Sequence, residues 1–444
     1  MKRTLIVLAL MAIMFGMAAA TETRVATFGP ASIFVDDYTD IYFLPAAALS
    51  YPRLIAAEMG NSFPVTSDYG WTYGSAAVLF SNAEQTYGVV GLDINHEILG
   101  ADFFNGAIND INTSNALVAL SPMGYNLVIP APDNRFHVFY ARKMDNLKLG
   151  LHLGWAGSST SYDFSDTVTA TPTEKGEGSA SIWDINGNVA IDVNENTSAD
   201  LAFSVKMQSF SSKYDYTWPT PPQDGATIES DGGMGLDLGL RASYGMADNF
   251  ALIPVIGLSM NSVAYKTSYV DTAIHAEGGK TSSFGFSGAF GGNYKPAENV
   301  TIVGGLLVSQ YTETIEDTMG VFGVGVNTEE NSTFTFPGFC AGLEIDLLKW
   351  LTLRAGAAKL LQNYSGKYER TASTEEYSYT DAPYFYAFGL GFKFGKLAVD
   401  VKMNNNAPYS LGYFMSGIDN DGTMYDGTLT HTEPITSIGM TYAF

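Results

Sequence analysis

The amino-acid sequence predicts an all-β protein: a transmembrane, antiparallel, up-and-down β-barrel of about 16 strands, with 14 strands as the alternative. Three observations predict it: apolar residues at every second position, connections that alternate between short and long, and an apolar, alternating chain end. Only 16% of the 444 residues are charged, and 13% are aromatic. Outside the N-terminus, no apolar run reaches the ~18 residues of a membrane-spanning helix, so strands are the elements expected to cross.

The first twenty residues have the three parts of a secretory signal peptide. Lys2 and Arg3 precede an apolar stretch over 5–17, which ends in Ala18-Ala19-Ala20. A basic start, an apolar centre and small residues at the cleavage site are typical of exported proteins. We therefore expect a signal peptide over 1–20, a mature chain that starts near Thr21, an N-terminal periplasmic or lumenal segment over 21–51 and a barrel over 52–444.

Two-residue periodicity is clearest in the middle of the chain. Between residues 147 and 155 the apolar positions are Leu147, Leu149, Leu151, Leu153 and Trp155. The intervening positions are glycine, polar or charged, as expected for a face that lines water. Aromatic residues such as Trp155, Trp183, Tyr244, Tyr294 and Tyr442 stand at the ends of such segments, where membrane–water interfaces favour them.

Short connections made of turn residues alternate with long polar segments. The short ones lie at 81–83, 144–146, 194–196, 247–249, 296–299, 348–349 and 395–396; the long ones lie near 61–71, 97–133, 159–179, 211–231, 267–281, 315–331, 367–382 and 406–432. Seven short turns and eight long loops require sixteen strands, but the first two are weak, which leaves fourteen open. By analogy with outer-membrane barrels, short turns are expected on the periplasmic side and long loops outside.

The chain ends on alternating apolar residues, Ile438, Met440, Tyr442 and Phe444. This ending resembles the C-terminal strand signature of Gram-negative outer-membrane proteins, which the barrel-assembly machinery reads. The resemblance implies that the chain lies in the outer membrane of a Gram-negative bacterium, in contact with its lipid and lipopolysaccharide. It also implies the barrel-assembly machinery as a partner; the oligomeric state stays open.

A second resemblance lies in residues 36–47. This segment is similar to the Asn-Pro-Ala region of the FadL-like outer-membrane transporters, with Pro45 and Ala46 matching and Leu44 standing in place of asparagine. The resemblance implies an N-terminal hatch inside the lumen and a route for hydrophobic substrates. The leucine removes a polar side chain that could pin the hatch, and that family has fourteen strands. The alternative is a periplasmic extension that caps the barrel.

Alternation places several charged and imidazole side chains on the inner face of the barrel, where they are candidates for lining the lumen. They are Arg135, Lys148, His152, Asp184, Lys206, Asp237, Arg241, Glu344, Arg354, Asp400 and Lys402, together with Asp93 and His137. Charges on the lipid face cost about 2–4 kcal/mol at mid-membrane, which supports an inward assignment. They either line a water-filled channel that sorts solutes or pair across the wall and stabilise its interior.

The longest connection, 97–133, is unusually apolar for a loop. It contains Phe103, Phe104, Ile108, Ile111 and further aliphatic residues up to Ile129. A large exposed apolar surface is rare on proteins unless it binds something. We therefore expect this connection to fold into the mouth or lumen; a lid or a partner-binding surface is the alternative.

Several function classes are disfavoured. A net charge of −23 repels nucleic acid. With five histidines and no recognisable serine, histidine and carboxylate spacing, no enzyme and no cofactor are predicted. The run 419–422 resembles a calcium loop, but Thr430 replaces the glutamate that an EF-hand needs, so no metal site is predicted. Cys340 is expected to be a small buried residue rather than a reactive thiol.

Together these observations predict an outer-membrane channel for passive diffusion or uptake of small solutes. It would be porin-like if the lumen is open, and FadL-like, for hydrophobic substrates, if the N-terminal segment fills it. The alternative is a non-transporting surface barrel, such as an adhesin, a scaffold or a secretion-associated component, whose loops bind partners.

Overall fold

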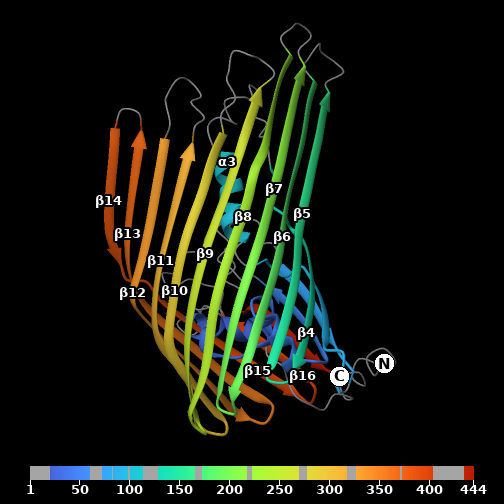
Figure 1. Cartoon of the computed structure of the whole chain (residues 1–444), viewed down its shortest axis with the longest axis vertical. Coiled ribbons are helices and arrows are strands. Elements are labelled where there is room, and N and C mark those ends of the chain that lie inside the picture. Colours follow the sequence, from blue (N-terminus) through green and yellow to red (C-terminus); the bar gives the residue numbers. More distant parts are fainter. Residues whose placement is uncertain are drawn as a thin grey trace, which may run out of the picture.

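The structure is a computed structural model that describes residues 21–60, 73–82, 84–98, 101–113, 129–165, 173–217, 223–269, 278–317, 327–370, 373–403 and 435–444. These residues form one antiparallel sheet that closes on itself (Figure 1). Its strands are β1 (Leu54–Gly60), β2 (Tyr73–Phe80), β3 (Val89–Ile94), β4 (Asn134–Met144), β5 (Leu147–Ser165), β6 (Thr173–Asn194), β7 (Thr197–Thr217), β8 (Gln223–Ala247), β9 (Phe250–Tyr269), β10 (Gly278–Ala297), β11 (Val300–Asp317), β12 (Asn327–Leu348), β13 (Leu351–Arg370), β14 (Ser373–Asp381), β15 (Tyr384–Phe394), β16 (Leu397–Met403) and β17 (Ile435–Ala443).

The barrel closes where the C-terminal strand meets the first strand. β1 pairs with β2 on one side and with β17 on the other, where Leu54 stands opposite Ala443. β14 and β15 both pair with β13, one beyond the other, so together they fill a single position in the wall. The seventeen strands therefore occupy sixteen positions. The predicted antiparallel barrel of sixteen strands is confirmed, and the alternative of fourteen is wrong.

Short turns join the strands at one end of the barrel, which we call the turn end; the opposite end is the loop end. Turns of two residues follow β4, β6, β8, β10, β12 and β15, as predicted. Asp145 and Gly395 have φ values of 55° and 65°, the left-handed conformation that tight hairpin turns require. The connection from β2 to β3 is longer than predicted, because β3 begins only at Val89.

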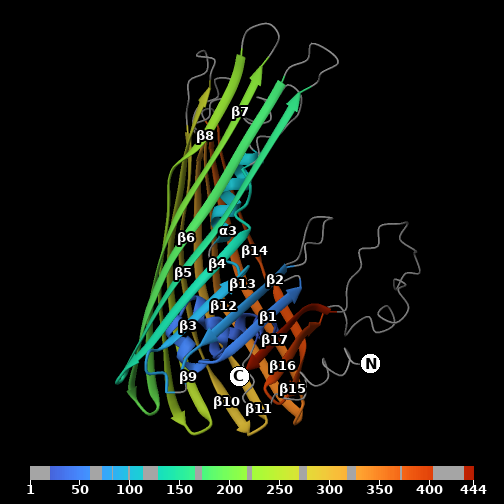
Figure 2. The same ribbon diagram turned by 90° about the vertical axis from the view of Figure 1, so that its right-hand side faces the viewer.

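The wall has very different heights around the barrel. β5 to β13 contain 18 to 25 residues each, whereas β1, β2, β3, β16 and β17 contain 6 to 9. A tilted strand crosses a membrane with ~9–11 residues, so the tall strands continue well beyond it (Figure 2). The predicted loops at 159–179, 211–231, 267–281, 315–331 and 367–382 were therefore too long, since strands extend into both ends of each segment.

The outer face explains that error. From Leu147 to Trp155 every second residue of β5 points outward and is apolar, and Trp155 lies beside Trp183 with 6.3 Å between ring centroids. Beyond this tryptophan pair the outward residues are hydroxyls that bond across strands, Ser181 to Ser209 at 2.9 Å and Ser179 to Ser211 at 3.1 Å. The apolar alternation marks the membrane band and stops with it, while the hydrogen-bonded ladder continues into water.

Short helices lie inside the ring of strands. They are α2 (Glu22–Ala26), η1 (Gly29–Phe34), η2 (Tyr38–Tyr42) and η3 (Pro45–Ser50) near the turn end, and α3 (Ala101–Thr113) higher up, against the inner side of the tall strands (Figures 1 and 2). None of the helices in the described part of the chain is long and apolar enough to cross a membrane.

Candidate functional site

The lumen contains two segments of the chain, and the first is the N-terminal plug, residues 21–51. Its aromatic side chains pack on small residues of the inner wall. Phe28 and Phe34 are fully buried against residues of β9 to β13, and Tyr38 and Ile41 are buried against residues of β1 to β4. The apolar contacts on both sides hold the plug across the lumen at the turn end.

A buried ionic network joins the plug to β12, β13 and β16. Arg24 of α2 binds both carboxylate oxygens of Glu344 on β12, at 2.8 and 3.1 Å, and also pairs with Asp37 at 3.1 Å. Arg354 on β13 reaches the same Glu344 at 2.6 Å and pairs with Asp400 on β16. Since a two-pronged arginine–carboxylate pair fixes distance and orientation together, this network sets the position of α2.

A second ionic contact holds the plug to β8. Arg241 on β8 binds Asp36 at 2.8 Å and Asp40 at 3.0 Å, on either side of the start of η2. Asp37 caps η2 by accepting a hydrogen bond from the Thr39 amide, and Asp40 completes a capping box. The acidic residues at 36–40 therefore both cap the short helix and hold it against Arg241.

The hatch-like motif Leu44-Pro45-Ala46 is pinned by asparagines of the wall. The Ala46 amide donates to Asn188 Oδ1 at 2.6 Å, and Asn186 Nδ2 donates to the carbonyl of Tyr42 at 2.7 Å. Gly150 on β5 lies beneath the motif, where a Cβ would be only 2.5 Å from the carbonyl carbon of Pro45. Asparagines of β6 thus supply the polar contacts that a leucine at position 44 cannot make. Gly150, which has no side chain, allows the backbone of Pro45 and Ala46 to lie close to β5.

Three histidines gather around Tyr42 of the plug. Its ring stacks on His96 with 3.5 Å between centroids, and the rings of His137 and His152 stand edge-on to it. A nitrogen of His137 lies 2.8 Å from one of His152, and the other nitrogen lies 2.9 Å from the carbonyl of His96. The cluster joins the plug to β4, β5 and the chain that leads into α3.

Burial shifts several pKa values at this interface. Outside the strands, burial raises the pKa of Glu22 to about 7 and that of Asp37 to about 7, in the second case against the attraction of Arg24. Burial, helped by the nearby His137, lowers the pKa of His96 to about 3. His96 is therefore neutral at neutral pH, as stacking inside an apolar contact requires.

The structure places all of the predicted lumen-lining residues on the inner face, but most of them are used in local pairs. Lys206 is buried and pairs with Asp237, while Lys148 pairs with Asp192 at 2.8 Å. Asp184 accepts a hydrogen bond from Ser204 at 2.6 Å. Arg241, Glu344 and Asp400 bind side chains of the plug, and His152 stands against Tyr42, whereas Arg354 joins Glu344 to Asp400 within the wall. Their roles in selecting a solute stay predictions.

The second lumenal segment is α3, which belongs to the long connection 97–133. Phe104, Ile108 and Ile111 of α3 are buried with Ile129 against the inward side chains of β5 to β9. The inner wall contributes Ala156, Ala180, Ile182, Phe210, Tyr214, Ile228, Val263 and Tyr265 to this cluster. The described part of the connection therefore folds inward, as expected, and it makes the upper lumen apolar.

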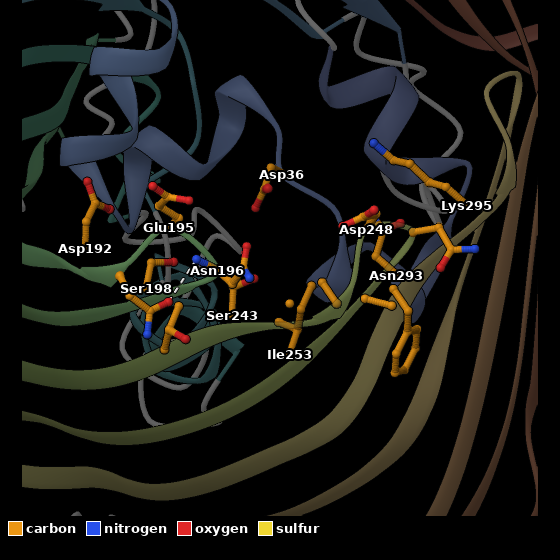
Figure 3. A pocket seen from close by; sticks show the side chains of 17 residues that line it. Asp36, Asp192, Glu195, Asn196, Ser198, Ser243, Asp248, Ile253, Asn293 and Lys295 are labelled. Atoms are coloured by element: carbon orange, nitrogen blue, oxygen red, sulfur yellow. Dashed lines mark hydrogen bonds between the residues drawn. The ribbon is translucent and has the colours of Figure 1, made fainter.

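A polar pocket of about 720 Å³ lies at the turn end, where the strand ends face Asp36 of the plug (Figure 3). Its lining is mostly polar and acidic, with Asp192 and Glu195 on one side and Asp248 beside Lys295 on the other (Figure 3). The pocket follows the ends of β6 to β10, beside the plug.

Two smaller predictions can be placed. Cys340 faces inward in the cluster that holds Phe28 and is 7% exposed, as predicted for a small buried residue. The run 419–422 lies outside the described residues. Among the described residues, no group of three or more His, Cys, Asp or Glu side chains is arranged to hold a metal ion.

The geometry can be compared with known proteins. No protein-family model matches the chain, and no curated protein sequence matches it significantly. Among solved structures, the fold is similar to a FadL homologue of Pseudomonas aeruginosa, with 10% identity, 97% of this chain and 100% of that chain covered, and a TM-score of 0.35. For the Pseudomonas putida toluene transporter TodX the identity is 9%, the match covers 96% of this chain and 97% of that chain, and the TM-score is 0.34. For the outer membrane protease OmpT from Escherichia coli the identity is 12%, the match covers 68% of this chain and 97% of that chain, and the TM-score is 0.25. These likenesses are too weak to carry an argument about function.

The residues that hold the plug were only partly foreseen. The wall charges Arg241, Glu344, Arg354 and Asp400 were found because alternation assigns a face. Asn186, Asn188 and Glu58 were missed, although the same alternation places them inward. The signal that could have found them is a polar amide or carboxylate at an inward position beside small residues, which suggests a bound backbone rather than water.

Proposed function

We propose that this protein is an outer-membrane barrel of a Gram-negative bacterium that passes small apolar or amphipathic molecules inward by passive diffusion, past a plug that restricts the lumen. The observation that carries the proposal is the apolar inner surface of the upper lumen. Ile182, Phe210 and Val263 face inward there, above the membrane band, and α3 covers them. An open, water-filled pore for ions has no need of such a surface.

The plug favours this proposal over a general porin. Its ion pairs and apolar contacts reach the low wall and the tall strands alike, so solutes meet packed side chains at the turn end. The polar pocket beside Asp36 is a suitable exit for a molecule that has left the apolar region. No group for catalysis is part of the proposal, which is that of a non-enzymatic barrel.

Binding of an apolar dye and channel recording test the proposal together. We expect the purified barrel to bind N-phenyl-1-naphthylamine and to show no steady conductance in a planar bilayer, while deletion of residues 21–48 produces stable conductance steps. Ile108→Asp, on the buried side of α3, is expected to weaken dye binding at least about tenfold, because a buried charge costs several kcal/mol. Asn109→Asp, on the exposed side of the same helix, is the matched control.

The alternative, a surface barrel whose outer part binds partners, is favoured by the long strands beyond the membrane band. It predicts that neither the intact protein nor the deletion variant conducts and that the dye is not bound. That outcome would remove the transport proposal. Steady conductance of the intact protein would instead show that the plug does not restrict the lumen.

A further inference from the structure

Glu58 is a buried carboxylate on the inner face of β1 that accepts hydrogen bonds from the first turn of the plug. It is 4% exposed. Its oxygens accept hydrogen bonds from the Glu22 amide at 2.7 Å, from the Thr23 hydroxyl at 2.8 Å and from the Tyr38 hydroxyl at 3.4 Å. All of these donors are neutral. A carboxylate taken out of water is costly to keep charged unless a cation lies close to it.

The neighbouring cations are already shared among other carboxylates. In the described structure, Arg24 pairs with Asp37 and Glu344, and Arg354 pairs with Glu344 and Asp400; neither pairs with Glu58. Three carboxylates, Asp37, Glu344 and Asp400, therefore share these two guanidinium groups, and Glu58 shares neither. Lys402 acts electrostatically on Glu22, which also feels Glu97 and lies 3.6 Å from His96. The region thus has more acid than base.

Thr21 lies beside two of these carboxylates, Glu58 and Asp400. Its side chain is fully buried, donates a hydrogen bond to Asp400 Oδ2 at 2.8 Å, and accepts one from the Arg24 amide at 3.0 Å. Gly439 on β17 lies beneath it: a Cβ there would collide with the Glu58 carboxylate and would be 2.6 Å from Thr21 Cβ. The side chain of Thr21 and the carboxylate of Glu58 therefore meet over Gly439, and Asp400 lies 2.8 Å from the Thr21 hydroxyl.

We propose that the α-ammonium group of Thr21, released when the signal peptide is removed, is the cation that this site lacks and locks the plug to Glu58 and Asp400. The proposal rests on the predicted cleavage between Ala20 and Thr21. In that step a signal peptidase hydrolyses the peptide bond: the water oxygen adds to the Ala20 carbonyl carbon, the C–N bond breaks, Ala20 leaves as a carboxylate, and both water hydrogens end on the Thr21 nitrogen, which becomes an ammonium ion. Export and plug docking would then be coupled, because the precursor has an uncharged amide at this position. The inference does not depend on what the barrel transports.

Chemical labelling of the exported, folded protein is the first test. Mass spectrometry is expected to show that the mature chain begins at Thr21. Acetylation of its α-amine by an N-hydroxysuccinimide ester should be at least about tenfold slower than that of Lys349, an exposed turn residue, and should become fast after heat unfolding. A different first residue, or rapid labelling in the folded barrel, would overturn the proposal.

A variant cycle then separates charge from simple burial. Inserting one glycine between Ala20 and Thr21 moves the ammonium group by about 3.8 Å, the spacing of one residue. We expect this insertion to lower the unfolding temperature of the native barrel clearly, and to have little effect in a Glu58→Gln background, where the charge to be matched is gone. Additive effects of the two changes would contradict the proposal. Glu195→Gln, in an exposed turn, is the control for loss of an acid, and if Glu58→Gln does not fold, the labelling result decides.

Discussion

The membrane band and the upper wall, which we define as the part of β5 to β14 beyond Trp155 and Trp183, have opposite polarity. In the membrane band the outer residues are apolar and the inner face is charged and hydrogen-bonded, as with Leu151 outside and His152 inside. In the part of the upper wall that surrounds α3, serines stand on the outer face and apolar residues line much of the inner face, as with Ser181 outside and Ile182 inside. One continuous β-ladder serves both regions, so the surroundings of each face, and not the backbone, decide which residues it carries.

The difference also assigns separate tasks to the two regions. The lower lumen binds the plug through ions and amides, which fix its position. The upper lumen binds α3 through side chains without charge. Three predictions test this contrast, ordered by expected effect.

The largest effect is expected from removing a buried cation of the lower lumen. Arg354→Met leaves Glu344 and Asp400 without their shared partner, so we expect a loss of about 3–5 kcal/mol in the free energy of unfolding. Urea titration in detergent micelles measures it. The matched change in the upper wall is Lys213→Met: Lys213 is 57% exposed and pairs with Asp215, so its loss should leave the free energy of unfolding nearly unchanged. Equal effects would mean that the two regions do not differ in burial of charge.

A smaller effect is expected on the outer face. Leu151→Arg places a charge in the middle of the membrane band and should destabilise the barrel in lipid vesicles by about 2–4 kcal/mol. Ser161→Arg, on the same face of the same strand but beyond Trp155, should change stability by less than about 0.5 kcal/mol. Unfolding in vesicles compares them. A similar cost at both positions would show that the membrane band does not end at the tryptophan pair.

The smallest effect concerns the pH dependence of the plug. Burial raises the pKa of Glu22 to about 7, above its ordinary value of 4.5, so the folded state binds a proton more tightly than the unfolded state between these values. Stability from this group is present below pH 4.5 and is lost as the pH rises through about 7. Glu22→Gln cannot ionise, so its stability should not fall over this pH range. The variant should have the same free energy of unfolding as the wild type at pH 4, and one higher by about 1–3 kcal/mol at pH 8, a range that allows for the partial exposure of Glu22.

Heat-induced loss of the compact band on gels, measured from pH 4 to pH 9, follows the difference between wild type and Glu22→Gln. Asp102→Asn, on the exposed side of α3, is a control for the removal of an acid. A constant difference across the pH range would show that Glu22 does not titrate between these limits.

Much of the barrel could be predicted from local patterns. Leu147 to Trp155 alternate because one face meets lipid, the two-residue turns at 145–146 and 395–396 contain residues that adopt tight turns, and the apolar C-terminal strand, including Ile438 and Met440, closes the ring against β1. The strand count followed from these turns. The length of the strands did not, because beyond Trp155 the outer face is in water, and the signal used to recognise a strand disappears while the strand continues.

What the sequence determined by itself was the closed antiparallel wall and which side chains face inward, because lipid and water impose their pattern on every second residue. What only the tertiary structure decided was the content of the lumen: Arg24 on Glu344, Asn188 on Ala46, Glu58 beneath Thr21, and α3 on the upper wall. These contacts join residues far apart in the chain, 142 positions in the case of Asn188 and Ala46. Neither partner carries a local sign of the other, so distances and burial become known only once the barrel has brought the two segments together.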